Sequence, residues 1–179
     1  MFVEAISGES FVMEIEFRGA RVEVVRCPDT IWCGSVAYAS DCIAEPDIQG
    51  LLEKYQANCV IPKAECADPD WSCCISIDYW QNGAVPRGMC FAQQVLTGEQ
   101  DAAHDVYIMP ESLYLRAAAS EENARVIFGK ASCEVWELFD FLREAMNSAG
   151  YSIGTNGAQE IEMYNHEAGM AYAYVQVKE

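Results

Sequence analysis

The stretch from residue 132 to residue 150 constrains the fold most, because it has the pattern of a helix with both ends marked. Ser132 can accept hydrogen bonds from the first free N–H groups, and Glu134 lies beside the positive end of the helix dipole. Gly150 can adopt the left-handed conformation that closes the last turn. Apolar residues recur at helical spacing at Val135, Leu138, Phe139, Leu142 and Met146. The stretch therefore predicts an amphipathic helix with one face to bury.

Two alternating segments after this helix, residues 160–164 and 171–177, predict strands. In the first strand, Ile161 and Met163 form one row, which we expect to pack on the helix. The opposite row of this strand contains Glu160, Glu162 and Tyr164. The polar row of the last strand contains Tyr172, Tyr174 and Gln176. We expect the carboxylate and the tyrosines to share one face, which is either a solvated sheet surface or the wall of a polar-aromatic pocket.

The composition is that of an ordered globular protein, with 51% hydrophobic and 22% charged residues among 179. The net charge of −17 should repel DNA phosphates and anionic lipid. We therefore expect no direct nucleic-acid binding and no membrane partner, whereas a cationic or neutral partner is easier to accept. No segment approaches the roughly 20 apolar residues that cross a bilayer, and the N-terminus has acids where a signal peptide needs a basic and then an apolar run. The expected location is the cytoplasm.

Nine cysteines and two histidines show no Cys-x-x-Cys pair and no zinc-site spacing. In a reducing compartment the thiols are interpreted as small core residues. A Gly-x-Ser-x-Gly elbow and a Gly-rich phosphate loop are also missing from the sequence. We accordingly predict no metal site and no cofactor.

The rest of the chain predicts further strands and one more helix. The expected strands cover residues 11–17, 22–26, 31–38, 71–80, 105–109 and 113–119. A helix is expected at residues 45–58, with Pro46 in its first turn and an apolar stripe of Ile48, Leu51, Leu52 and Tyr55. The fold class predicted by these elements is α+β, with antiparallel sheets and two helices.

The order strand, helix, strand, strand occurs twice, in about residues 20–110 and 111–179, which predicts two pseudo-symmetric βαββ units within a single domain of residues 1–179. Superposing the units places Asp78 and Trp80 at the positions of Glu162 and Tyr164. Tyr107 then corresponds to the row of Tyr172 and Tyr174. Matched carboxylates and aromatic residues favour a central ligand cleft shared by the two halves.

The residues resemble those of the GyrI-like, or effector-binding, domain that occurs in many bacterial AraC-type and MerR-type transcription regulators and also as a free-standing protein. The matching features, in chain order, are Ile77-x-Tyr79, Val85-Pro86-x-Gly88, Ile108-Met109-Pro110, the helix with Trp136 and Phe139 that ends in Ser148-Ala149-Gly150-Tyr151, Glu162-x-Tyr164 and Val175-Gln176-Val177. The resemblance covers roughly residues 18–179, and a DNA-binding portion is missing.

This resemblance implies a multidrug-binding cleft in which a buried glutamate and aromatic walls hold a lipophilic cation. By its position in the motif, the glutamate is Glu162. The predicted ligand-binding residues are Glu162, Tyr164, Trp80, Tyr107, Tyr172, Tyr174, Asp78 and Trp136. No catalytic residue is assigned. The partner that fits the missing DNA-binding portion is a separate transcription regulator or another protein.

Three functions stay open on the sequence alone. The first is a binding module for lipophilic cations that acts as a sensor or sequesters its ligand. The second is a hydrolase of reactive small molecules, with Glu162 as general base and a tyrosine as proton donor. The third is an acidic protein-interaction role, such as modulation of gyrase. We favour binding without turnover.

Overall fold

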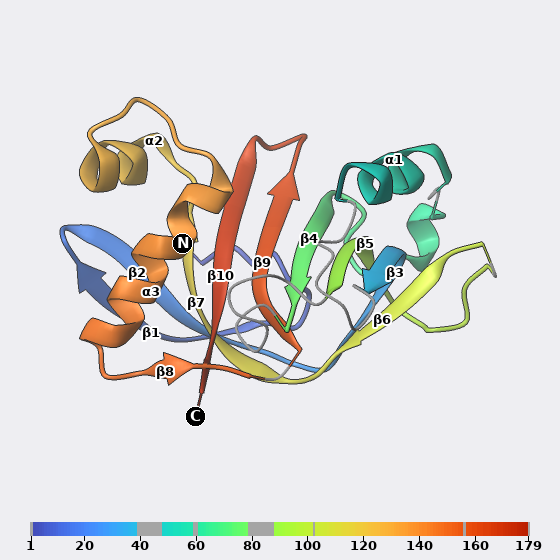
Figure 1. Cartoon of the computed structure of the whole chain (residues 1–179), viewed down its shortest axis with the longest axis horizontal. Helices are drawn as coiled ribbons and strands as arrows, with labels where there is room; N and C mark the ends of the chain where they lie inside the picture. The colour runs from blue at the N-terminus through green and yellow to red at the C-terminus, as the bar shows by residue number, and fades with distance from the viewer. Residues whose placement is uncertain are drawn as a thin grey trace.

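A computed structural model describes residues 2–38, 48–58, 61–78, 88–101, 103–155 and 157–178. Within these ranges the chain is an α+β fold built on one ten-stranded antiparallel sheet, in the order β1-β2-β7-β10-β9-β4-β5-β3-β6, with β8 paired to β10 (Figure 1). The strands are β1 (Ser10–Phe17), β2 (Ala20–Cys27), β3 (Thr30–Tyr38), β4 (Trp71–Ile77), β5 (Gly88–Val95), β6 (Asp105–Met109), β7 (Ser112–Ala118), β8 (Ser152–Ile153), β9 (Ala158–Asn165) and β10 (Met170–Lys178). The α-helices are α1 (Ile48–Asn58), α2 (Glu121–Asn123) and α3 (Leu138–Ser148). Short helical turns are η1 (Lys63–Glu65), η2 (Ala124–Phe128) and η3 (Val135–Glu137).

Strand β5 is the one long element that the sequence pattern did not reveal. It pairs with β3 on one side and with β4 on the other. The sequence had suggested residues 105–109 as the fourth element of the first unit. Among the described strands, β6 pairs with β3 alone, at the outer end of the sheet. β5 alternates poorly because most of its residues are buried from both sides. With β5 included, β3–α1–β4–β5 and β7–α3–β9–β10 have the same order of elements.

Two different layers cover the two faces of the sheet. On one face, called the helix face here, α3 packs through Leu138 and Leu142 on the small side chains of Ala173 and Val175. Helix α1 covers the same face further along the sheet, where Leu51 packs on β4 and β5. The N-terminal segment, residues 2–6, covers the opposite face. Both faces of the central strands are therefore buried.

The expected orientation of β9 is wrong. Ile161 and Met163 pack in the core under the N-terminal segment, not against α3. Glu162 and Tyr164 therefore lie on the helix face, because neighbouring residues of a strand point to opposite faces. Alternation shows that a strand has two different faces, but it does not show which one receives the helix when both are covered.

Helix α3 ends as the sequence predicts, but it begins differently. Gly150 has a φ of 81°, and the Tyr151 N–H donates to the carbonyl of Met146, which closes the last turn. The N-terminal cap is Glu134, not Ser132: Glu134 and Glu137 form a reciprocal capping box at η3. This turn precedes α3 and places Trp136 outside the core, 62% exposed.

Arg116 anchors the N-terminal segment to the sheet. Its side chain is 1% exposed and forms ion pairs with Glu9 at 2.5 Å and with Glu23 at 2.7 Å. It also donates to the carbonyl of Val3, and its guanidinium lies 4.4 Å from the centre of the Phe2 ring. Buried charges need such complete compensation, so this cluster fixes the N-terminal segment on the sheet.

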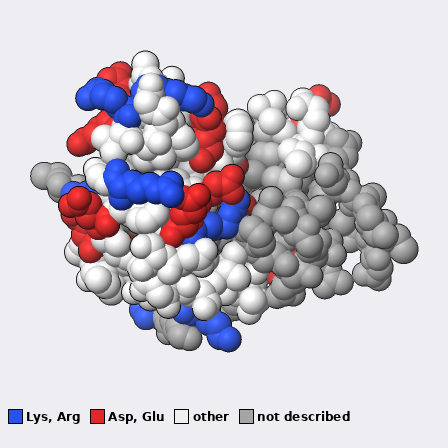
Figure 2. Space-filling model, turned by 60° about the vertical axis from the view of Figure 1, so that its left-hand side comes forward, with Lys and Arg blue, Asp and Glu red and all other residues white. Residues whose placement is uncertain are grey.

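Ion pairs on the outer surface near β1, β2 and α3 are far more exposed. Figure 2 shows basic side chains next to acidic ones on this side of the molecule. Arg18 pairs with Glu144 at 2.6 Å, and Arg21 pairs with Glu14 at 2.6 Å. Such solvated pairs contribute little to stability. No helix within the described ranges is long and apolar enough to cross a membrane.

The difference between these two kinds of ion pair can be measured. We expect Arg116→Met to lower the free energy of unfolding by roughly 3–5 kcal/mol, because it leaves Glu9 buried without its cation. The matched variant Arg18→Met should cost less than about 1 kcal/mol, because its partner Glu144 is exposed. Urea unfolding followed by circular dichroism measures both. Equal small losses in the two variants would show that the Arg116 cluster does not hold the N-terminal segment.

Candidate functional site

A cavity of about 490 Å³ opens on the helix face between α1 and η3. The strands beneath it are β9, β4 and β5, and Figure 1 shows α1 and α3 on either side of these strands. The lining residues are Ile48, Leu52, Tyr55 and Gln56 from α1, Trp136 from η3, Ser72, Cys73, Cys74, Met89, Phe91, Glu162 and Tyr164 from the strands, and His166 after β9. Most of this lining is apolar or aromatic.

Strand register brings the floor of this cavity together. Cys74 of β4 lies opposite Glu162 of β9 on one side and opposite Phe91 of β5 on the other. Ser72 lies opposite Tyr164 in the same way. Directly opposite residues share a face of the sheet. Residues that are far apart in the sequence therefore become neighbours on the floor.

Glu162 is a partly buried carboxylate, and its negative charge is only weakly compensated by neighbouring groups. Burial raises its pKa, Glu134 raises it further, and a hydrogen bond from the Tyr164 hydroxyl opposes both. Among the described residues no cationic side chain forms an ion pair with it, and Oε1 accepts no hydrogen bond. Burial and the neighbouring carboxylate likewise raise the pKa of Tyr164, which keeps its hydroxyl protonated as a donor. A bound cation would stabilise the ionised form of Glu162.

A second cavity, of about 340 Å³, adjoins the first towards α3. The two cavities share Ile48, Met89 and Trp136. The second one is also lined by Ser76, Phe139, Asp140, Arg143 and Glu160. Because they share three lining residues, we describe the two cavities together as the groove.

Glu160 lies two residues before Glu162 on β9 and is 3% exposed. Arg143 of α3 pairs with its Oε1 and also with Asp140. Burial raises the pKa of Glu160 to about 7, the Glu162 carboxylate raises it too, and Arg143 opposes both. No described residue donates a hydrogen bond to Oε2 of Glu160. The groove thus contains two carboxylates, each with an oxygen that lacks a donor among the described residues.

Three of the predicted ligand residues come together in the groove: Glu162, Tyr164 and Trp136. Trp136 is mostly exposed and lines both cavities. Trp80 lies outside the described residues.

Tyr172 and Tyr174 lie on the opposite face from Glu162, so the expectation that these groups share one face is wrong. In the register of β9 with β10, Glu162 is opposite Ala173, whereas Tyr174 is opposite Ile161. Tyr174 is fully buried and donates a hydrogen bond to Glu9 at 3.1 Å. The bulky tyrosines fit the irregular N-terminal segment, while the alanine row leaves room for α3.

The first-unit candidates Tyr107 and Asp78 do not line the groove either. Tyr107 is buried in the core under the N-terminal segment, opposite Trp32 on β3. Asp78 follows β4 with a φ of 52°, and its N–H donates to the carbonyl of Gly157 at 2.8 Å. The superposition of the units had suggested Tyr107 by matching residues 105–109 to β10, and it had suggested Asp78 by matching this residue to Glu162.

Sequence reasoning missed the wall that α1 and β5 provide. The apolar stripe of Ile48, Leu52 and Tyr55 was predicted correctly, but it was not assigned to the ligand site. Met89 and Phe91 were missed together with β5. Glu160 stood in the same row as Glu162 and was not selected. The spacing of two acids on one strand face was the available signal.

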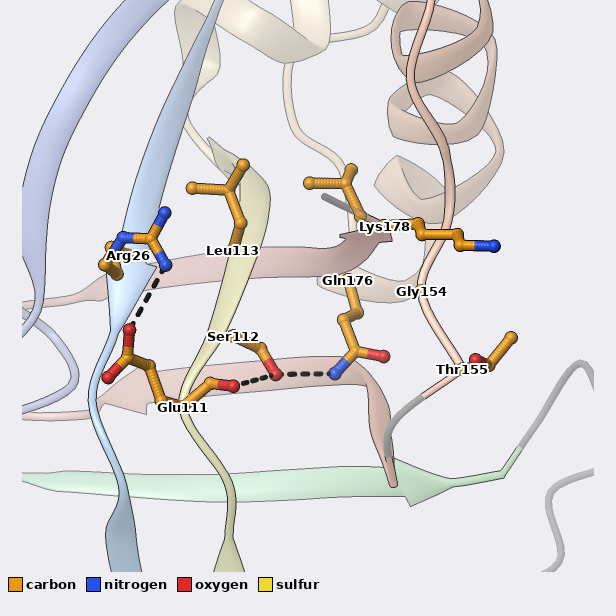
Figure 3. A pocket seen from close by; sticks show the side chains of 9 residues that line it. Arg26, Glu111, Ser112, Leu113, Gly154, Thr155, Gln176 and Lys178 are labelled. Atoms are coloured by element: carbon orange, nitrogen blue, oxygen red, sulfur yellow. Dashed lines mark hydrogen bonds and ion pairs between the residues drawn. The ribbon is translucent and has the colours of Figure 1, made fainter.

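A third cavity, of about 290 Å³, lies near the ends of β2 and β10 and the start of β7 and is lined mostly by polar residues (Figure 3). Arg26 pairs with Glu111 at 3.2 Å. The Gln176 amide donates to Ser112, which donates to the carbonyl of Glu111. Its polar groups satisfy one another, so they leave less for a ligand than the groove does. Within the described ranges no cluster of three His, Cys, Asp or Glu side chains could hold a metal ion.

Comparisons with known proteins identify the fold. No family model matches the sequence, and no curated protein matches it. Among solved structures, the chain is similar to VCH_CASS2, an integron cassette protein from the mobile metagenome of Vibrio cholerae, with 12% identity and a TM-score of 0.55 over 96% of this chain and 100% of that one. A putative bacterial transcription regulation protein from Staphylococcus aureus MU50 matches with 16% identity and a TM-score of 0.54. The match covers 90% of this chain and 100% of that one. SAV2435, in a structure bound to tetraphenylphosphonium, matches with 14% identity and a TM-score of 0.51. The match covers 88% of this chain and 93% of that one.

The chain therefore has the GyrI-like effector-binding fold. The resemblance inferred from the sequence motifs is confirmed at this level. In this GyrI-like fold the groove lies over the junction of β9 and β4.

The buried acid Glu160 gives stability a defined pH dependence. Because folding raises the pKa of Glu160 to about 7 from 4.5, the folded state holds the proton more tightly. Its favourable contribution is complete below about pH 4.5 and is lost as the pH rises through 7. A glutamine at this position cannot ionise. We expect the unfolding free energy of Glu160→Gln, relative to the unmodified protein, to increase by on the order of 1–3 kcal/mol between pH 5 and pH 8.

Urea unfolding at the two pH values measures this difference. The two proteins differ only at residue 160, so the change of the difference with pH reports the ionisation of Glu160 together with its coupling to Glu162. A difference that is identical at pH 5 and pH 8 would show that folding does not raise the pKa of Glu160.

Proposed function

We propose that this protein binds lipophilic cationic small molecules in the groove, as a sensor or as a sequestering protein. The observation that carries the proposal is the state of Glu162. It is a partly buried carboxylate on the floor of an apolar cavity, and no described cation is paired with it. A desolvated carboxylate is costly unless a positive partner compensates it, and a cationic ligand supplies that partner.

The walls of the groove suit a bulky organic cation. Trp136, Tyr55, Tyr164 and Phe91 offer aromatic surface around Glu162. Aromatic faces attract delocalised cations, and apolar contact adds the burial energy. A cavity of about 490 Å³ lies within the size range of small-molecule sites. The net charge of −17 would also raise the local concentration of cations.

The fold adds support of a general kind. SAV2435, which shares the fold, has been seen with tetraphenylphosphonium, a lipophilic cation. The repeated element order also fits the predicted pair of pseudo-symmetric βαββ units, with the cleft where β9 meets β4. In this proposal Glu162, Tyr164 and Trp136 touch the ligand. Tyr172 and Tyr174 pack on the opposite face of β10, under the N-terminal segment.

A second candidate is hydrolysis in the same groove. The hydrogen bond between Tyr164 and Glu162 favours it, because a carboxylate base beside a protonated hydroxyl is a competent acid–base pair. Release of product from a reactive ester or strained-ring substrate, lost in Glu162→Ala, would support turnover. Stoichiometric binding without product supports the binding module alone.

Charge-matched probes test the binding proposal. We expect Glu162→Gln to weaken tetraphenylphosphonium by tenfold or more, about 1.4 kcal/mol or above. Neutral triphenylphosphine oxide should change less than about twofold, since it gains nothing from the carboxylate. Isothermal titration calorimetry gives both affinities.

The matched control is Asp78→Asn, which removes an acid that lies outside both cavities. This variant should bind both probes as the unmodified protein does. If Glu162→Gln weakens the cationic and the neutral probe equally, the carboxylate does not recognise charge and the proposal fails.

A further inference from the structure

The groove has more carboxylate than a single positive charge can compensate. Its described lining includes Glu160, Glu162 and Asp140, against one guanidinium, that of Arg143. Arg143 pairs with Asp140 and with Oε1 of Glu160, and it forms no ion pair with Glu162. One cation at Glu162 would therefore leave the second cavity still acidic.

The unbonded oxygen of Glu160 is the feature that calls for a donor. The side chain is 4% exposed, and Oε2 accepts no hydrogen bond from any described residue. A buried carboxylate oxygen that lacks a partner costs free energy, whereas a ligand N–H or cation placed there recovers it. The second cavity, lined by Glu160, is where such a group would sit.

The two carboxylates are spaced and joined as the ends of one site. Glu160 and Glu162 are alternate residues of β9, so their Cα atoms are about 7 Å apart on the same face. Ile48, Met89 and Trp136 line both cavities, so the surface that the two cavities share is apolar. A hydrocarbon or aromatic spacer can cross this shared surface without burying a polar group.

We propose that the groove selects elongated lipophilic dications, with one cationic group at Glu162, the other at Glu160 and the apolar spacer against Trp136 and Met89. This inference rests on the proposed function and specifies its ligand class. Arg143 then acts as a specificity residue: it holds Glu160 in place through one oxygen and leaves the other for the ligand.

The alternative is that the Arg143–Glu160 pair only ties α3 to β9. A purely structural pair would not distinguish a dication from a monocation of the same apolar size. The ratio of the two affinities therefore separates the two roles, whereas a simple loss of binding would not.

A spacer series measures that ratio by calorimetry. The probes are bis(triethylammonium) alkanes with three to ten methylene groups, each compared with the alkyl-triethylammonium monocation of the same chain length. In the unmodified protein we expect the dication to bind at least tenfold tighter at spacers of five or six methylene groups. The advantage should fall at shorter and longer spacers. Equal affinities across the series would overturn the inference.

Two variants then locate the second cationic group. Glu160→Gln should bring the affinity ratio at the best spacer to within twofold of one. Ser76→Met, which fills the second cavity from β4 beside Glu160 and keeps both charges of the ion pair, should do the same. Asp78→Asn should keep the full ratio. A ratio that survives both Glu160→Gln and Ser76→Met would place the second charge elsewhere and contradict the proposal.

Failure of the two proposals can be told apart. If monocations and dications both bind and Glu162→Gln weakens both, but their ratio is one, the cation site stands and the dication preference is wrong. If Glu162→Gln changes neither probe, the proposed function itself is wrong. A thermal melt of each variant shows whether it folds, and the ratio is interpreted only for variants that do.

Discussion

The pairing of β4 with β9 is the contact on which the rest of the structure depends. It joins β4, β5, β3 and β6 on one side to β9, β10, β7, β2 and β1 on the other and makes one continuous sheet. The register places Cys74 opposite Glu162 and Ser76 opposite Glu160. A shift of one residue would turn both carboxylates into the core under the N-terminal segment, where Ile161 and Met163 now lie. The fold and the groove therefore depend on the same hydrogen-bond ladder.

Charge compensation divides the molecule into a structural side and a ligand side. Under the N-terminal segment, Arg116 meets Glu9 and Glu23 and receives further support from aromatic rings. On the helix face the negative charge is incompletely compensated, because Arg143 forms an ion pair with only one oxygen of Glu160. Buried charge that is fully paired stabilises a unique arrangement, whereas buried charge that is partly paired leaves interaction energy for a ligand. This contrast is the reason for placing function on the helix face.

Local pattern predicted the elements well where one physical signal dominated. The helix around residues 138–148 and its Gly150 terminus followed from apolar spacing and the left-handed conformation of glycine. The break between the expected strands 11–17 and 22–26 is the turn between β1 and β2, where Arg18 and Gly19 both have positive φ. β5 was missed because its two buried faces remove the alternation that reveals a strand. Ser132 was chosen as the cap because Ser is a good N-cap, but the chain makes an extra turn, η3, that Glu134 and Glu137 close.

By itself, the sequence determined that the protein is α+β, that a helix ending at Gly150 is followed by two strands, and that Glu162 and Tyr164 lie on the same strand face. Those results follow from periodicity, which depends only on near neighbours in the chain. Only the tertiary structure decided that this face lies under the helices, that Tyr172 and Tyr174 lie behind it, and that α1 and β5 complete the groove. The reason is physical. With the N-terminal segment covering one face and the helices the other, both sides of the sheet are buried, and alternation cannot say which side meets which layer.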